Sequence, residues 1–159
     1  MRILLDTHVL LWLATDDAKL SRGTRTLIED GDNECLFSPV SIAEIALKHK
    51  KHPDLMPFDG TEARSVFLRD GLLELPLTSR HAAEADSLEL YHSDPFDRML
   101  LAQAKSEGIK IVSHDRQFPP IRRFCHQGMR VRNNNQRHSF PFGQIRAPQE
   151  NHLKGTNRK

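Results

Sequence analysis

Short apolar runs that lead into helix-like patterns recur along the first part of the chain. RILLD over residues 2–6 predicts a strand, and THVLLWLA over residues 7–14 predicts a helix that begins directly after it. ECLFS over residues 34–38 predicts a second strand, and SPVSIAEIALKHKK over residues 38–51 a second helix. The order of strand followed by helix therefore occurs twice in the first third of the chain.

The alternation continues up to residue 113. The pattern predicts helices over residues 59–70 and 78–91, with a short apolar segment between them at 72–76. It then predicts a last helix over 94–107, which ends at Gly108, and a strand over 109–113. Strands that alternate with helices predict an α/β fold with a parallel sheet.

Two aspartates follow predicted strands directly. Asp6 ends the first strand, and Asp115 comes just after the last one. In open parallel sheets, ligands bind beyond the carboxyl ends of the strands, so both residues are candidates for a functional site. An aspartate after a strand also commonly caps a helix or forms a turn, and for either residue alone that interpretation is favoured.

A third aspartate begins the core-facing side of the last predicted helix. Asp97, Leu100, Leu101 and Ala104 follow the i, i+3, i+4, i+7 spacing of one helix face. Asp94 before a proline is explained as an N-cap. A favourable position in the first turn explains Asp97 only partly, because a carboxylate on an apolar face is costly to bury unpaired; a metal ion, an arginine or water at the sheet edge would each serve as its partner.

Glu44 is a fourth acidic candidate, with two structural alternatives. Ser41 lies three residues before it, as in a capping box, and Lys48 lies four residues after it, as in a surface ion pair. On a helical wheel Glu44 and Lys48 lie opposite the stripe of Ile42, Ile45 and Ala46. Glu44 is therefore expected to reach any site from the edge of the helix.

Composition divides the chain into a body and a tail. Residues 119–159 contain nine Lys and Arg against the single acid Glu150, a charge of +8, whereas residues 1–118 carry −6, which together make the net charge of +2. The tail has too little apolar content to order itself on a core. We expect one domain over 1–118 and a largely disordered basic extension over 119–159.

No apolar run is long enough to suggest a membrane span, and the N-terminus does not read as a signal peptide. The two cysteines, Cys35 and Cys125, are far apart and suggest neither a disulfide framework nor a zinc site. A reducing cytoplasm is the expected location.

Four motifs together resemble the PIN-domain ribonucleases, and more narrowly the VapC-type toxins of bacterial toxin-antitoxin pairs. The motifs are LLDTHVLLW, SPVSIAEIALK, DPFDRMLLAQA and IVSHDRQF, in the order and at about the spacing of the family. The resemblance covers residues 1–118 and implies a three-layer α/β/α fold with a parallel sheet of four or five strands. The final edge strand is in doubt, since only GMRVR after Phe118 could form it.

The resemblance also implies the roles of individual residues. It implies Asp6, Glu44, Asp97 and Asp115 as the catalytic acids, with Asp6, Asp97 and Asp115 as ligands of Mg²⁺ or Mn²⁺. Hard oxygen ligands suit these ions, and divalent cations would neutralise carboxylates that otherwise repel one another. An RNA substrate, a cognate antitoxin and an optional homodimer are the implied partners.

Neighbouring residues have open roles. Ser113 and Thr7 adjoin the acids and could hydrogen-bond to them, and Arg98 could contact phosphate or pair with an acid. His8, His92 and His114 flank the acids and could touch substrate, although surface or turn positions are the default for histidines without metal spacing.

Two functions compete. The resemblance predicts a metal-dependent endoribonuclease, the toxin of a toxin-antitoxin pair. The alternative is a catalytically inert PIN-like module that sequesters an antitoxin or RNA because the atypical C-terminus spoils the pocket. For the basic tail, attraction of RNA competes with a solvated extension of no function.

Overall fold

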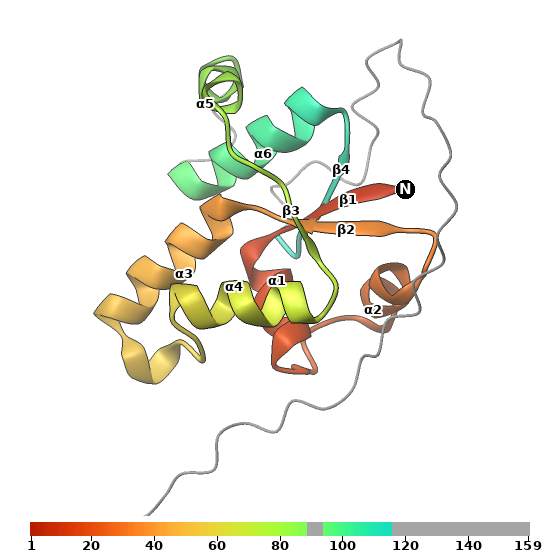
Figure 1. The fold of residues 1–159 in the computed structure, drawn as a ribbon, viewed down its shortest axis with the longest axis vertical. Helices are drawn as coiled ribbons and strands as arrows, with labels where there is room; N and C mark the ends of the chain where they lie inside the picture. The colour runs from red at the N-terminus through yellow and green to blue at the C-terminus, as the bar shows by residue number, and fades with distance from the viewer. Residues whose placement is uncertain (89–93, 116–159) are drawn as a thin grey trace, which may run out of the picture.

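The computed structural model describes residues 1–88 and 94–115, and a single parallel sheet organises them (Figure 1). Its strands lie in the order β3-β2-β1-β4. They are β1 (Arg2–Leu5), β2 (Glu34–Phe37), β3 (Leu73–Glu74) and β4 (Lys110–Val112). The predicted α/β fold is confirmed, with four strands in the described residues. The doubtful fifth strand lies outside them, as do the whole of the 119–159 tail, Cys125 and His92.

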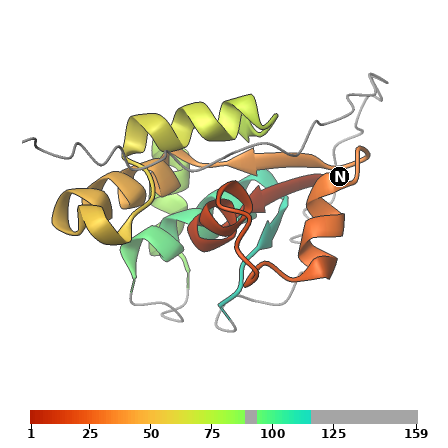
Figure 2. The same ribbon diagram turned by 90° about the horizontal axis from the view of Figure 1, so that it is seen from below.

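Alternating side chains of the central strands give the sheet two buried faces. On one face, the side chains of β1 and β2 pack with helices α1 to α4, and the strand residues are Ile3, Leu5, Cys35 and Phe37. On the other face, Leu4 and Leu36 pack with Leu100, Leu101 and Ala104 of α6. Helices α4 and α6 accordingly lie on opposite sides of β1 and β2 (Figures 1 and 2). The three-layer arrangement is confirmed.

Six α-helices and one short 3-10 helix connect the strands within the described residues. They are α1 (Thr7–Ala14), α2 (Arg22–Glu29), α3 (Pro39–Lys51), the 3-10 helix η1 (Pro53–Leu55), α4 (Gly60–Arg69), α5 (Ser79–Asp86) and α6 (Pro95–Glu107). None of the helices in this part of the chain is long and apolar enough to cross a bilayer.

The pattern missed one helix and overestimated two elements. Helix α2 has the sequence RGTRTLIE, whose apolar residues Leu27 and Ile28 are too few for a recognisable stripe, and a hydrogen bond from Thr24 N to Ser21 Oγ (3.1 Å) caps it. Helix α5 ends at Asp86, before the predicted residue 91. The apolar segment 72–76 contains a strand of only two residues, β3, which pairs with β2 at the edge of the described sheet.

Both ends of α6 follow the local sequence as predicted. Asp94 Oδ1 accepts a hydrogen bond from Phe96 N (2.8 Å), and Pro95 occupies the first turn. The helix ends at Gly108, whose φ of 64° lies in the left-handed region that favours glycine. Local sequence signals therefore set the first and last residues of the helix that carries Asp97.

A buried polar link joins α6 to the start of α3. Gln103 is fully buried on α6; its Oε1 accepts a hydrogen bond from the Ser38 hydroxyl, and its Nε2 donates to the Leu75 carbonyl (3.3 Å). Ser38 Oγ in turn accepts from Val40 N (3.0 Å) and caps α3. The link sets the helix of Glu44 and the helix of Asp97 relative to one another, through the end of β2.

Candidate active site

The carboxyl ends of β1 and β4 bring two distant segments together. The strands pair in parallel, with Leu5 opposite Val112, and Asp6 N donates a hydrogen bond to the Val112 carbonyl (3.0 Å). Asp6 and Ser113 therefore leave the sheet side by side, although 107 positions separate them. The prediction that Asp6 and Asp115 follow the same sheet edge is consistent with this pairing.

Ser113 connects Asp6 to the loop that carries Asp115. Its hydroxyl donates a hydrogen bond to Asp6 Oδ2 (2.8 Å) and accepts one from Asp115 N (3.0 Å). The predicted contact of Ser113 with an acid is thus confirmed. Asp115 itself is exposed. Its backbone N–H and the Asp6 carboxylate bind the same Ser113 hydroxyl, which links the two residues.

Asp6 stands at the N-cap of α1 without capping it. Its backbone has extended cap geometry, yet the side chain makes no capping hydrogen bond. The carboxylate is 3% exposed, and no Lys or Arg in the described part of the chain forms an ion pair with it. The capping interpretation of Asp6 is therefore wrong, because its side chain accepts a hydrogen bond from Ser113 instead.

Burial raises the pKa of the Asp6 carboxyl, and the nearby charge of Glu44 raises it further. The Ser113 hydrogen bond, the charge of His8 and the Thr7 N–H oppose this and lower the pKa. Burial is the largest of these causes. A divalent cation beside Asp6 would act in the opposite direction to burial and favour the ionised form.

Glu44 is a second buried acid, and its charge acts on Asp6. It is 4% exposed, and its Oε1 accepts a hydrogen bond from Lys48 Nζ (2.5 Å). The predicted i,i+4 ion pair is confirmed. The capping box with Ser41 is not formed, because Ser38 is the N-cap of α3 and the Ser41 hydroxyl has no partner in the described residues.

The expected orientation of α3 is also wrong. The buried residues of this helix are Val40, Ser41, Glu44 and Ile45, whereas Ala46 is exposed. The reason is tertiary, since α3 contacts α1, α4 and α6 and is covered from more than one side. Glu44 consequently faces the interior and not a helix edge.

Asp97 lies in the first turn of α6 and is partly buried, next to the fully buried positions Leu100 and Leu101 of the same face. The predicted stripe is thus present, with the carboxylate at its outer end.

Arg98 has a structural role that the sequence did not indicate. Its Nη2 donates to the carbonyls of Ala85 (2.6 Å) and Leu88 (3.3 Å), at the end of α5. The ion pair with an acid considered for Arg98 is not found among the described residues. Carbonyl groups in the last turn of a helix lack partners within the helix, and Arg98 satisfies that of Ala85 together with the carbonyl of Leu88 just beyond α5.

An aromatic cluster beside the acids escaped the sequence interpretation. The indole of Trp12 lies 4.8 Å from the ring of His114, edge to face, and 6.1 Å from the ring of His8. Both histidines are exposed, as expected, and Trp12 is only partly buried. The i,i+4 spacing of His8 and Trp12 was the available signal, but the contact with His114 exists only in the tertiary structure.

The donor chemistry around Asp6 suits a hard divalent cation. Asp6 is buried and forms no ion pair with a Lys or Arg of the described residues, and the buried Thr7 Oγ1 beside it has no hydrogen-bond partner in the same residues. In residues 1–88 and 94–115, however, no three His, Cys, Asp or Glu side chains are grouped so that they could hold a metal. Asp6 fits as the first ligand of such a cation, and Glu44 is a second buried acid whose charge acts on it.

Comparisons with known proteins agree with this architecture. No curated protein matches the sequence. A chain in the crystal structure of VapBC2 from Rickettsia felis bound to a DNA fragment from their promoter is similar in fold, with a TM-score of 0.57 and 14% identity over 74% of this chain and 91% of that chain. The family model of the PIN domain matches residues 3–123, which is most of the sequence. The chain belongs to the PIN-domain family.

Proposed function

We propose that this protein is a metal-dependent endoribonuclease and the VapC-type toxin of a toxin-antitoxin pair. The observation that carries the proposal is the state of Asp6. It is buried at the carboxyl edge of a parallel sheet, does not cap its helix, and lies near the second buried acid, Glu44. A buried carboxylate that does not cap its helix contributes little to the stability of that helix. A bound ligand explains its position better.

We propose Mg²⁺ or Mn²⁺ as the cofactor, with Asp6, Asp97 and Asp115 as ligands and Glu44 as a further catalytic acid. Carboxylate oxygens without cysteine or grouped histidine are the donor set of these ions. When bound, such an ion supplies an activated water and stabilises charge on the phosphodiester. Because the described acids do not form a complete cluster, the contributions of Asp97 and Asp115 depend on the test below.

The side chains around the acids have defined tasks in this proposal. Ser113 fixes one oxygen of Asp6 and ties the Asp115 loop to it. Lys48 compensates the charge of Glu44, so that the second acid can stay buried beside the first. The Ser38–Gln103 hydrogen bond holds the helix that carries Glu44 against the helix that carries Asp97.

The proposed partners follow from family membership. The similar solved structure is that of VapBC2 bound to a DNA fragment from their promoter. By analogy we propose a cognate antitoxin as the protein partner of this chain, with a homodimer as an open alternative and the cytoplasm as the location.

The test is cleavage of a panel of single-stranded RNAs by the full chain with Mg²⁺, with Mn²⁺ and with EDTA. Asp97→Asn should abolish metal-dependent cleavage while the circular dichroism spectrum stays unchanged. Asp32→Asn is the matched control, since Asp32 is an exposed aspartate in the turn before β2. Full cleavage by Asp97→Asn would contradict the proposal.

The alternative function is an inert PIN-like module that binds an antitoxin or RNA. Two observations favour it: the described acids do not form a group of three, and Glu44 already has a cationic partner in Lys48. RNA binding without cleavage at saturating Mg²⁺ and Mn²⁺ would support this alternative and exclude the nuclease.

A further inference from the structure

One face of α3 passes from the buried acid to exposed lysines. Glu44, Lys48 and Lys51 occupy positions i, i+4 and i+7, which lie on the same side of an α-helix. Val40 and Ser41 begin this side and are buried, whereas Lys51 at its far end is exposed. The side of α3 that is buried at its start therefore becomes an exposed basic surface towards the end of the helix.

Lys48 lies at the point of transition. The side chain of Glu44 is 5% exposed and that of Lys48 is 42% exposed, and Lys48 Nζ lies 2.5 Å from Glu44 Oε1. An ammonium group has three donors, and the Glu44 contact uses one. Lys48 thus contacts the buried Glu44 and also reaches solvent, where its remaining N–H donors can bind an anion.

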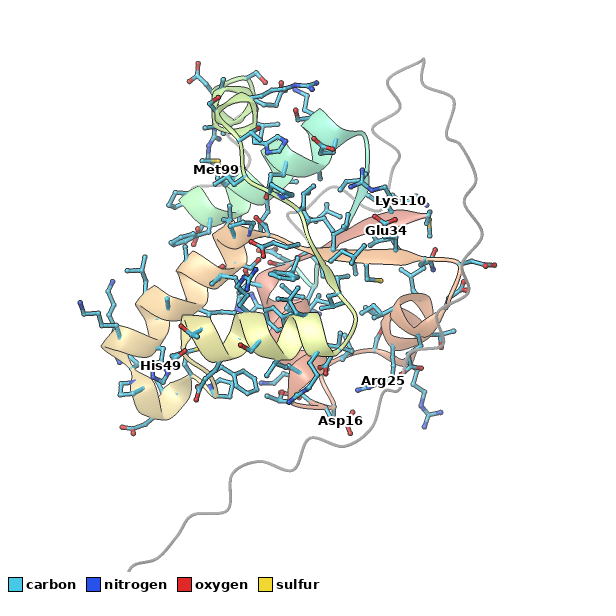
Figure 3. The ribbon with its side chains drawn as sticks, viewed as in Figure 1. Asp16, Arg25, Glu34, His49, Met99 and Lys110 are labelled. Carbon is cyan, nitrogen blue, oxygen red and sulfur yellow. The ribbon has the colours of Figure 1, made fainter. Side chains whose placement is uncertain are left out.

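The basic end of α3 stands clear of the sheet. The last turn of the helix contains Lys48, His49, Lys50 and Lys51, and Figure 3 shows His49 at the end of α3 that is remote from the strands. Neither Lys50 nor Lys51 forms an ion pair with any described residue. The charges of Lys50 and Lys51 are therefore not neutralised by ion pairs within the described residues.

We propose that Lys48 and Lys51, the lysine face of α3, bind successive phosphates of single-stranded RNA and lead the strand towards the buried acids Glu44 and Asp6. This inference rests on the proposed function and assigns the path of its substrate. Lysines one helical turn apart form a line of positive charge. Such lines follow the backbone of single-stranded nucleic acids without reading their sequence.

A simpler explanation exists for basic residues at this place. Cations in the last turn of any helix interact favourably with its dipole. That effect depends on distance from the helix end and not on the helix face. Lys50 separates the two explanations, because it is as exposed and as close to the end as Lys51, but six positions from Glu44 and so on another face.

The experiment measures binding of a short labelled single-stranded RNA to the full chain by fluorescence anisotropy, in EDTA and over a series of NaCl concentrations. Lys51→Gln should weaken binding roughly threefold to fivefold at low salt and reduce the slope of log K against log[NaCl] by about 0.7, the value for one lost phosphate contact on a single strand. Lys51→Arg should retain the wild-type slope.

Two matched controls carry the same change of charge. Lys50→Gln alters the other face of the same helix end, and Arg22→Gln alters an exposed cation on α2, which lies at the opposite end of the molecule from α3 in Figures 1 and 2. Both controls should leave the slope within error of wild type. Thermal melts of all variants verify that the fold is retained.

Equal losses in Lys51→Gln and Lys50→Gln would overturn the proposal in favour of general attraction by net charge. An unchanged slope in Lys51→Gln would overturn it as well. An acidic peptide offered in place of RNA tests a protein ligand for the same face. If Lys51→Gln impairs only peptide binding, the lysine face serves a protein partner and the RNA proposal is wrong.

The test does not depend on the nuclease proposal, since no metal is present and no cleavage occurs. Absent cleavage by the wild type in Mg²⁺ or Mn²⁺ would refute the proposed activity. A selective loss of salt dependence in Lys51→Gln would still show that RNA follows this face.

Discussion

Asp6 and Asp94 occupy the same position at the start of a helix, and the fold uses them differently. Asp94 caps α6 through a 2.8 Å hydrogen bond from Phe96 N, and it remains exposed. Asp6 precedes α1 with comparable extended geometry, but it is buried, makes no cap and accepts from Ser113. Asp94 is explained by the stability of its helix, whereas Asp6 is not.

We interpret this difference as one between a structural carboxylate and a candidate functional one. A capping aspartate stabilises the folded chain at neutral pH. A buried aspartate whose pKa is raised by burial destabilises it there, since the ionised form is disfavoured in the folded state. A residue that persists at a cost to stability is a reasonable candidate for catalysis or metal binding.

The largest expected effect is that of Asp6→Asn on activity. We expect RNA cleavage to fall by on the order of 100-fold or more, because a first ligand of the proposed metal is lost. Asp94→Asn serves as the matched control at the equivalent helix position and should retain most activity. Initial rates at several Mn²⁺ concentrations measure the effect, and equal activity of the two variants would remove the distinction between the two aspartates.

Ser113→Ala should have the next largest effect. Its hydroxyl lowers the pKa of Asp6, so its loss should raise that pKa further and move the acidic limb of the rate profile to higher pH. Loss of a residue that orients a metal ligand also lowers activity by roughly tenfold. The measurement is kcat/KM against pH. A reduced rate with an unshifted profile would show that Ser113 acts only on the loop of Asp115.

Asp94→Ala should reduce stability and spare the chemistry. Loss of an N-cap costs about 1 kcal/mol, which lowers the Tm of a domain of this size by roughly 4 °C. Thermal denaturation followed by circular dichroism measures the change. Asp94→Asn, which can still cap, is the control and should be nearly neutral. A Tm unaffected by Asp94→Ala would refute the structural assignment of this residue.

The smallest expected effect is the response of stability to pH. The pKa of Asp6 is higher in the folded than in the unfolded chain, so the folded state binds more protons between the two values. Stability attributable to this group is therefore present below the unfolded pKa and is lost as pH rises through the folded pKa. Asp6→Asn should have a Tm at neutral pH equal to or above that of wild type.

The difference in Tm between wild type and Asp6→Asn should decrease as the pH is lowered towards the range where Asp6 is protonated in both the folded and the unfolded wild type. Thermal melts of wild type and Asp6→Asn across a pH series measure it. A Tm of Asp6→Asn clearly below wild type at neutral pH would show that the ionised carboxylate stabilises the fold, contrary to our interpretation.

The parallel α/β architecture and both ends of α6 could be predicted from the sequence alone. The signals are local: the short apolar runs RILL and ECLF that precede helical patterns, the Asp94–Pro95 start and the Gly108 stop. The placement of Asp6 and Asp115 after strands that end at the same edge was also accessible, because parallel strands align their carboxyl ends.

Only the tertiary structure decided which side chains those residues meet. The Ser113–Asp6 hydrogen bond, the contact of Trp12 with His114 and the carbonyl contacts of Arg98 join segments that no local pattern relates. The burial of Glu44 depended on helices packing around α3 from several sides, which a helical wheel cannot represent. Helix periodicity specifies which residues share a face, but the neighbours that cover a face are set by the topology of the whole sheet.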